Sequence, residues 1–491
     1  MLRGQNKLLL PRNWFECALI GILCFSLLLR FWNLGKFNSL VFDEVYYPVF
    51  ANNYLLGNEV YNAHPPLSQY IIAIGIWLGS HLPFGQDIAN GYLGSWRTTF
   101  SYRWLNALTG SFLPLVIAGI AYQLTNRRSY ALVAAFLAAC DGLFLVESRF
   151  ALNNIYLVLF GLLGQLFFLL ALKNRKQKRW INLTFSGIFF GLSASIKWNG
   201  LGFLLGICLL WLIAWLIHYF QIRKHRPYPL KYYSRNYLNS KTFSTPLQNL
   251  TQINFLTFAG YLLIIPALTY RLSWVPHLLM NPEPNFWEMQ KEIMSFHQKV
   301  GSGPDIHPYC SRWYTWILML RPVAYFYQTA RNKIETVPIH PPLPSGTGKF
   351  IYDVHAMGNP FLWWLSSAAI ILLIIALILR FFKEGIGRYT STPQTWLALY
   401  LAFNYGANLL PWVKVSRCTF IYHYMAASIF AQLVLAWLVD RWLSSRLYGR
   451  RYAGIGVICL VLIAFSFWLP IYIGLPLSPE SYKLRMWFNW I

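Results

Sequence analysis

The chain has 491 residues, of which 56% are hydrophobic, 18% aromatic and only 12% charged. Soluble domains carry about 25% charged residues, so this composition excludes a soluble protein and indicates an integral membrane protein. The formal charge of +25 comes from short basic clusters between apolar runs, a pattern of membrane topology that argues against a nucleic-acid partner. Seven cysteines stand singly without CxxC spacing, so we expect neither a zinc site nor a disulfide framework.

Eleven apolar runs are long enough for membrane helices, since a span needs about 20 mostly apolar residues. They begin near Trp14, Trp104, Ser129, Ala151, Trp180, Leu201, Ile253, Pro360, Thr395, Thr419 and Tyr452. The first run lacks a small-residue cleavage site, so we expect a span and not a signal peptide. The sequence therefore predicts an all-α polytopic membrane protein.

One further segment, Leu67–Leu82, follows two prolines and is apolar for only about 16 residues. If it lies along the membrane surface, more than half of the 41 basic residues gather on one side and nearly all the carboxylates on the other. We therefore predict an interfacial helix, a cytoplasmic N-terminus and an extracytoplasmic C-terminus. The expected parts are an N-terminal module (1–270) with a large outer loop (33–103), a second outer loop (271–359) and a C-terminal set of helices (360–491).

Asp43 and Glu44 lie side by side just after the first span, in a chain with only 16 acidic residues. One interpretation makes Asp43 the N-cap of a helix from Val45 to Leu56. The other makes the pair a general base for a hydroxyl, or a cation or metal site, because adjacent carboxylates raise each other's pKa unless a cation is near. The nearby His64 either serves this site or faces the lipid headgroups.

Cations collect at the outer ends of separate predicted spans, where topology does not require them: Arg103, Arg149, Lys197 and Arg417. They either reach lipid headgroups or together hold a phosphate. Tyr422 and His423 add hydrogen-bonding groups beside Arg417. Asp141 is an acid within a predicted span, so we expect it to be functional or paired, with Arg149 or Arg103 as partner. The residues predict an outward-facing site for a substrate with a hydroxyl and a phosphate.

The order of motifs resembles the protein O-mannosyltransferase family of the GT-C superfamily. The matching segments run from residue 42 to residue 424: "FDEVYYPVFANNYLLGNEVYNAHPPL", "YRWLNALTGSFLPL", "DGLFLVESRFALNN", "SIKWNGL", "GNPFLWW" and "SRCTFIYHY". The resemblance implies a GT-C fold with about eleven transmembrane helices and interfacial helices in the first extracytoplasmic loop. It also implies mannose transfer from a polyprenyl (dolichyl-type) phosphate carrier to Ser or Thr of acceptor proteins, with inversion at the anomeric carbon.

With this resemblance, the expected roles of individual residues are as follows. Asp43 is catalytic with help from Glu44, and the phosphate of the sugar donor is bound by Arg103, Lys197, Arg417 and His423. Supporting positions are His64, Asp141, Arg149, Asn154 and Tyr422. The family often has aspartate where this chain has Asn154. Segment 271–359 is too short for the MIR domain of eukaryotic members, which favours a bacterial-type enzyme of the plasma membrane.

No cofactor is expected to be required, although the carboxylate pair leaves a divalent cation open. Two other functions are kept. A related GT-C transferase could move another sugar to a lipid or glycan with the same groups, and a membrane transporter could use the charges as counter-ions. The position of the acidic pair outside the first span favours chemistry, because a transporter needs charges along a central pathway.

Overall fold

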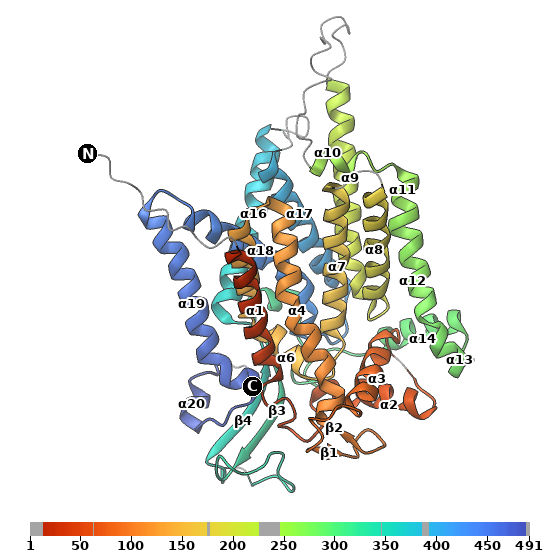
Figure 1. Cartoon of the computed structure of the whole chain (residues 1–491), viewed down its shortest axis with the longest axis vertical. Coiled ribbons are helices and arrows are strands. Elements are labelled where there is room, and N and C mark those ends of the chain that lie inside the picture. The colour runs from red at the N-terminus through yellow and green to blue at the C-terminus, as the bar shows by residue number, and fades with distance from the viewer. Residues whose placement is uncertain are drawn as a thin grey trace, which may run out of the picture.

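The computed structural model describes residues 13–61, 63–173, 177–224, 246–344, 346–384 and 392–487. Within these residues, eight helices are long and apolar enough to cross a membrane, or nine if the bent pair α5 and α6 forms one span. The long helices lie side by side in a bundle (Figure 1). They are α1 (Trp14–Phe31), α4 (Thr99–Thr125), α5 (Arg128–Ala139), α6 (Gly142–Arg149), α7 (Asn154–Lys173), α9 (Leu201–Lys224), α11 (Phe255–Ala259) continued by a π-helical turn into α12 (Ile265–Ser273), α16 (Pro360–Glu384), α18 (Met425–Leu443) and α19 (Tyr448–Ile473).

Two further helices coincide with predicted spans. Helix α8 (Gln177–Ala194) begins with polar and basic residues, and α17 (Pro393–Leu409) has only 17 residues. Each of the eleven predicted runs therefore contains a helix, but the number of membrane crossings stays a prediction.

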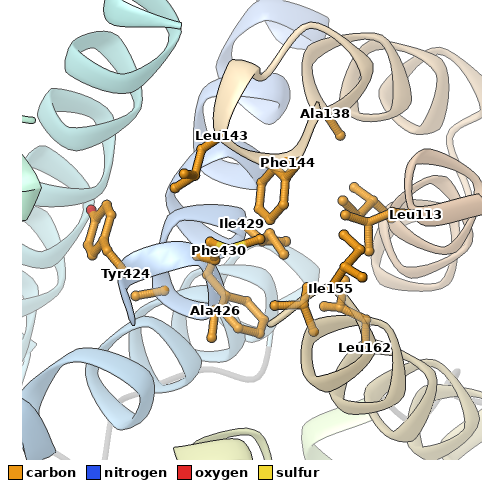
Figure 2. Packing of buried hydrophobic residues seen from close by; sticks show 14 of the residues in the cluster. Leu113, Ala138, Leu143, Phe144, Ile155, Leu162, Tyr424, Ala426, Ile429 and Phe430 are labelled. Carbon is orange, nitrogen blue, oxygen red and sulfur yellow. The ribbon is translucent and has the colours of Figure 1, made fainter. Parts of the chain in front are cut away.

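Helix α18 is the centre of the bundle, because 89% of the residues in its 18-residue apolar stretch are buried inside the protein. Its Ala426, Ile429 and Phe430 belong to one apolar cluster with side chains of α4, α5, α6 and α7 (Figure 2). Helix α1, in contrast, has only 11% of its corresponding stretch buried and lies at the periphery. The small residues of α18 let its neighbours approach closely, which is how helices associate without a hydrophobic driving force.

The third predicted span is broken, and the break directs α6 toward one end of the bundle. Helices α5 and α6 are bent by 59° relative to each other. The carboxylate of Asp141 caps α6 by accepting hydrogen bonds from the backbone N–H groups of Leu143 and Phe144. A side chain at Gly142 would meet the ring of Tyr472 at 2.2 Å, so glycine allows this close approach.

The short elements gather at one end of the bundle (Figure 1). They include η1 (Phe42–Val45), α2 (Tyr47–Leu56), α3 (Leu67–Gly79), β1 (Ala89–Asn90), β2 (Arg97–Thr98), α13 (Val275–Met280), α14 (Phe286–Lys299), α15 (Trp313–Ile317), β3 (Val323–Ala330), β4 (Phe350–Ala356) and α20 (Pro479–Lys483). The remaining short elements are η2 (Trp198–Gly200), α10 (Pro246–Leu250), η6 (Leu410–Lys414) and η7 (Ile421–Tyr424). Both predicted outer loops thus lie at the same end.

Helix α3 has 13 residues and is therefore about 20 Å long, too short for a hydrocarbon core of about 30 Å. This length fits the predicted interfacial helix. Much of the predicted basic face falls in residues 1–12, 174–176, 225–245 and 385–391, which lie outside the described residues. The predicted sidedness therefore stays a prediction.

The hairpin formed by β3 and β4 was not predicted from the sequence. These strands pair antiparallel, with an irregularity between Ala324 and Phe326 where β3 carries one extra residue. The hairpin packs on α6 and α19, and a separate bridge joins Ile351 to Leu477. It lies at the same end of the bundle as η1.

Candidate active site

The adjacent acids Asp43 and Glu44 occupy one turn of 3₁₀-helix, η1. Helix α2 begins only at Tyr47, and its N-cap Tyr46 makes no side-chain cap. The N-cap interpretation of Asp43 is therefore wrong. Successive residues of a 3₁₀-helix point about 120° apart, so the two carboxylates face different surroundings. Glu44 points into the protein and Asp43 lines a cavity.

Glu44 forms a fully buried ion pair with Arg103, at 2.7 Å between Oε2 and Nη2. Arg103 also donates from Nε to Glu44 Oε1 and from its remaining N–H groups to the carbonyls of Leu34, Phe37 and Ser39. The backbone N–H of Ala151 donates to the same carboxylate at 2.8 Å. All five N–H groups of the guanidinium are thus used within the protein.

These contacts correct two predicted roles. Arg103 does not bind the phosphate of a sugar donor, because its guanidinium is buried and fully hydrogen-bonded. Glu44 does not face the cavity, and its carboxylate instead ties the first loop to α4 and to the segment after α6. The pair is structural, and it fixes the turn that carries Asp43.

The side chain of Asp43 lines a cavity of about 470 Å³ together with His64, His297 and Arg417. Aromatic side chains complete the wall, including Tyr47 of α2, Phe296 of α14 and Phe420 before η7. Among the described residues, the carboxylate has no hydrogen-bonding partner. Burial raises the pKa of the Asp43 carboxyl to about 6, and the charge of Lys197 opposes that rise. This is the environment of a general base that works near neutral pH.

Basic side chains surround a second, smaller cavity of about 150 Å³, which shares His64, His297 and Arg417 with the first. Lys197 and His423 complete this cationic wall. The ring of His64 lies against that of His297 at a centroid distance of 5.0 Å. Desolvation and then the charge of Lys197 lower the pKa of His64 well below its usual value, so this ring is neutral at pH 7. Lys197 and Arg417 therefore carry the positive charge.

The two cations differ in how they are held. Lys197 Nζ donates to Asn154 Oδ1 at 3.1 Å and lies 5.3 Å from the ring centre of Tyr422. Arg417 donates from Nη1 to the carbonyl of Cys418, its only protein acceptor among the described residues. Most of its N–H groups remain available for an anion. His423 is fixed by a ring stacked on Trp316 and by Nδ1 contacts to Phe420.

Glu147 on α6 is a site residue that the sequence analysis missed. It accepts hydrogen bonds from Asn154 Nδ2 at 3.1 Å and from the hydroxyl of Tyr325. Asn154 therefore bridges Glu147 to Lys197. The signal was present, since Glu147 is an acid inside a predicted span and the same reasoning that selected Asp141 applies to it.

The predicted supporting residues Asp141 and Arg149 lie away from both cavities. Asp141 caps α6 and accepts a hydrogen bond from Gln432 at 2.7 Å. Arg149 donates to the carbonyls of Leu29, Arg30 and Trp32 at the end of α1. Neither forms the predicted ion pair with the other. Asp141 thus satisfies backbone N–H groups at the start of α6, and Arg149 satisfies carbonyls at the end of α1. These groups have no partner within their own helices.

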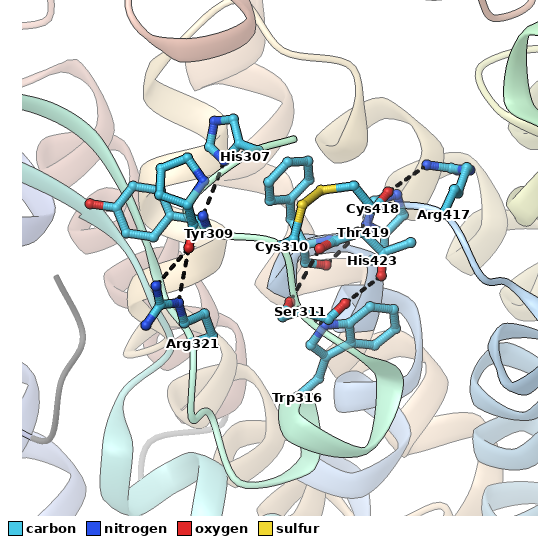
Figure 3. The surroundings of a disulfide bond; sticks show 12 residues. His307, Tyr309, Cys310, Ser311, Trp316, Arg321, Arg417, Cys418, Thr419 and His423 are labelled. Carbon is cyan, nitrogen blue, oxygen red and sulfur yellow. Dashed lines mark hydrogen bonds between the residues drawn. A yellow bond between two sulfur atoms is a disulfide. The ribbon is translucent and has the colours of Figure 1, made fainter. Parts of the chain in front are cut away.

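A disulfide between Cys310 and Cys418 lies beside the cationic wall, although the cysteine spacing did not indicate a disulfide framework (Figure 3). The two cysteines are 108 residues apart, and single cysteines at such a distance give no spacing signal. Backbone and side-chain hydrogen bonds between Ser311 and Thr419 continue the connection. The second outer loop is thereby fixed to the segment that carries Arg417.

The arrangement suits a reaction between a hydroxyl and a phosphate ester. A phosphate fits beside Lys197 and Arg417, and a hydroxyl beside Asp43 can lose its proton to the carboxylate. Among the described residues there is no group of three or more His, Cys, Asp or Glu side chains placed to hold a metal ion.

Comparisons with known proteins give one family. A family model described as dolichyl-phosphate-mannose-protein mannosyltransferase matches residues 20–277, and one described as the C-terminal four TMM region of protein-O-mannosyltransferase matches residues 282–491. The polyprenol-phosphate-mannose–protein mannosyltransferase of Corynebacterium glutamicum is 23% identical, over 96% of this chain and 92% of that protein. The protein of the same name from Mycobacterium tuberculosis is 25% identical, over 97% and 91%.

Solved structures show the same fold. The Saccharomyces cerevisiae Pmt1–Pmt2 complex bound to the sugar donor matches with a TM-score of 0.74 at 14% identity, over 97% of this chain and 92% of that chain. An oligosaccharyltransferase of Archaeoglobus fulgidus matches with a TM-score of 0.52 at 15% identity, over 96% and 57%. The fold is thus that of GT-C glycosyltransferases, and the chain belongs to the protein O-mannosyltransferase family.

Proposed function

We propose that this protein is a glycosyltransferase that moves mannose from a polyprenyl-phosphate-mannose to Ser or Thr hydroxyls of acceptor proteins. The observation that carries the proposal is the carboxylate of Asp43, which has no hydrogen-bonding partner in the part of the chain that the structure describes and shares a cavity with the cation Arg417. The full-length relatives named polyprenol-phosphate-mannose–protein mannosyltransferase support the sugar and the carrier.

In the proposed reaction, the acceptor oxygen attacks the anomeric carbon of mannose while the bond from that carbon to the phosphate oxygen breaks. The hydroxyl proton goes to Asp43, and the electron pair of the broken bond stays on polyprenyl phosphate. Attack from the side opposite the phosphate inverts the anomeric centre. Lys197 and Arg417 compensate the charge on the leaving phosphate, so a strong general acid is not needed there.

An apolar groove between α9, α16 and α17 suits the polyprenyl chain. Its volume is about 1050 Å³, and its lining is nearly all aliphatic and aromatic. The lining includes Pro411 and Lys414 of η6, the turn that also carries Trp412 into the wall of the phosphate cavity. A chain lying in this groove therefore leads its phosphate toward Lys197 and Arg417.

We place the active site on the extracytoplasmic face of the plasma membrane, with the N-terminus in the cytoplasm. The disulfide beside Arg417 supports this side, because disulfides form and persist in oxidising compartments. Single cysteines introduced at the exposed positions Asn58 and Gln86 flank α3. In a variant without exposed native cysteines, both should react with an impermeant thiol reagent added outside intact cells. Labelling from opposite sides would mean that α3 crosses the membrane.

The direct test incubates purified protein with polyprenyl-phosphate-mannose and a Ser/Thr-bearing peptide, and measures the mass of the peptide. One added hexose on a hydroxyl supports the proposal, and Asp43→Asn protein should add none at a comparable rate. Parallel reactions use other polyprenyl-phosphate sugars and a glycolipid acceptor. Transfer only in those reactions would make the protein a different GT-C transferase.

A further inference from the structure

One side chain of the hairpin β3–β4, that of Tyr325, contacts the residue before Asp43 and also Glu147. Tyr325 is the extra residue of the bulge in β3, since Ala324 pairs with His355 and Phe326 pairs with Val354. A β-bulge re-aims a side chain relative to the regular alternation of a strand. Tyr325 is buried, whereas Tyr327 on the same strand is 54% exposed.

The ring of Tyr325 stacks on Phe42, the residue directly before Asp43. The ring centroids are 4.2 Å apart and the planes differ by only 8°. Phe42 has a φ of 53°, a left-handed conformation that a bulky residue adopts only when its surroundings hold it there. Phe420, Tyr422 and His307 contact the same ring edge to face. The direction in which Asp43 leaves η1 therefore depends on how the Phe42 ring is held.

The hydroxyl of Tyr325 reaches the other half of the site. It donates to one carboxylate oxygen of Glu147, and Asn154 donates to the other oxygen. Asn154 in turn accepts the hydrogen bond of Lys197. One side chain thus contacts the neighbour of the acid through its ring and begins the hydrogen-bonded chain to a cation through its oxygen.

We propose that Tyr325 is a positioning residue that holds Asp43 and Lys197 in place relative to each other, by its ring through Phe42 and by its hydroxyl through Glu147. This proposal rests on the proposed function for its kinetic consequences, but its structural half stands without it. The two contacts belong to different parts of one side chain, so variants can separate them.

The structural half is tested by amide hydrogen exchange of peptides that cover residues 41–47. Their protected amides include those of Glu44 and Tyr46, which donate to the carbonyls of Val41 and Asp43. Tyr325→Leu and Phe42→Ala should each speed exchange in this segment by about tenfold or more, because the stacking partner is lost. Tyr325→Phe keeps the ring and should leave the exchange unchanged. Tyr327→Leu, on the same strand but largely exposed, is the matched control.

The kinetic half uses mannose transfer at varied sugar-donor concentration. Phe42→Ala should lower kcat by about 10- to 100-fold with little change in KM for the sugar donor, because the base is misplaced. Tyr325→Phe should instead raise that KM by about three- to tenfold, because Lys197 loses part of its support. A loss of folded protein would also lower the apparent kcat and leave KM alone, so kcat is calculated per folded protein; the raised KM of Tyr325→Phe cannot arise in that way.

Exchange of residues 41–47 that is as slow in Tyr325→Leu and Phe42→Ala protein as in the Tyr327→Leu control would overturn the inference. So would a Tyr325→Phe variant that matches Tyr325→Leu in both exchange and kinetics. If the wild-type protein transfers no mannose, the proposed function fails, and the exchange comparison still decides whether Tyr325 positions the turn.

Discussion

Replacing Asp43 by Asn is expected to remove transfer activity and to stabilise the folded protein at neutral pH. Asparagine has nearly the same shape but cannot accept the proton of the acceptor hydroxyl. Positioned general-base catalysis contributes about 10²- to 10⁴-fold, so turnover should fall by at least about a hundredfold. Binding of the sugar donor should persist, because Lys197 and Arg417 are unchanged.

The stability gain follows from the raised pKa. The difference between about 6 in the folded protein and the ordinary value of 3.8 corresponds to about 3 kcal/mol. A raised carboxyl pKa favours the protonated form on folding, so the destabilisation develops as pH rises from 3.8 and is complete above about 6. Asp43→Asn should therefore raise the free energy of unfolding by up to about 3 kcal/mol at pH 7.5 and by almost nothing at pH 3.5. The gain is reduced by the favourable interaction that Lys197 loses when the neighbouring carboxylate is removed.

The assay pairs peptide mannosylation with thermal unfolding of the same detergent-solubilised samples at several pH values. In wild-type protein, kcat should fall on the acid side with a midpoint near pH 6, so that about a tenth of the activity remains at pH 5. Near-normal transfer by a folded Asp43→Asn protein would refute the role of the base. A fall in kcat with a midpoint near pH 4 would refute the argument that burial raises the pKa of Asp43.

Three further predictions concern the groups around Asp43. Arg103→Met and Glu44→Gln should each lower the unfolding free energy by about 3–5 kcal/mol, because each change leaves a buried polar partner unpaired. The double variant should lose less than the sum of the two, and additive losses in thermal unfolding would argue against a coupled pair. Arg417→Ala should raise KM for the sugar donor by about 10- to 100-fold, with the exposed Arg312→Ala as control, and an unchanged KM would assign Arg417 to the lipid headgroups. Cys310→Ser should lower the free energy of unfolding by about 2–4 kcal/mol. It should also raise KM for the sugar donor, since the disulfide fixes the neighbour of Arg417. A melting midpoint equal to that of wild type would mean that the bond is absent in the protein.

The helices could be predicted well from the sequence, and the reason is physical. A chain inside lipid must satisfy its backbone hydrogen bonds within each segment, so every span appears as a local apolar run. The distribution of basic residues predicts an interfacial helix at Leu67–Leu82, and the 13 residues of α3 fit that prediction. The break between α5 and α6 was not predicted, because Asp141 resembles a functional acid as much as a helix cap.

The site was only partly predictable, because its key contacts join distant parts of the chain. Lys197 and Arg417 do line one cavity, as their positions at helix ends suggested. Arg103 looked equivalent to them in sequence, but its partner Glu44 lies 59 residues away and consumes its charge. Tyr325 gave no signal at all, since a bulge in an unforeseen hairpin directs it inward. The local sequence shows which charged side chains the chain contains, and tertiary contacts determine which of them are already paired within the protein.

The adjacent acids illustrate why two carboxylates are needed where one is proposed to perform the chemistry. A base in a nearly dry cavity holds its place only if the backbone that carries it is rigid, because its own charge favours movement toward water. A single carboxylate cannot provide that rigidity and remain free to accept a proton. In η1, Glu44 is fully occupied by Arg103 and by two backbone N–H groups, so it anchors the turn from inside. Asp43, one residue earlier on a different face, lines the cavity, and its carboxylate accepts no hydrogen bond from the described part of the chain.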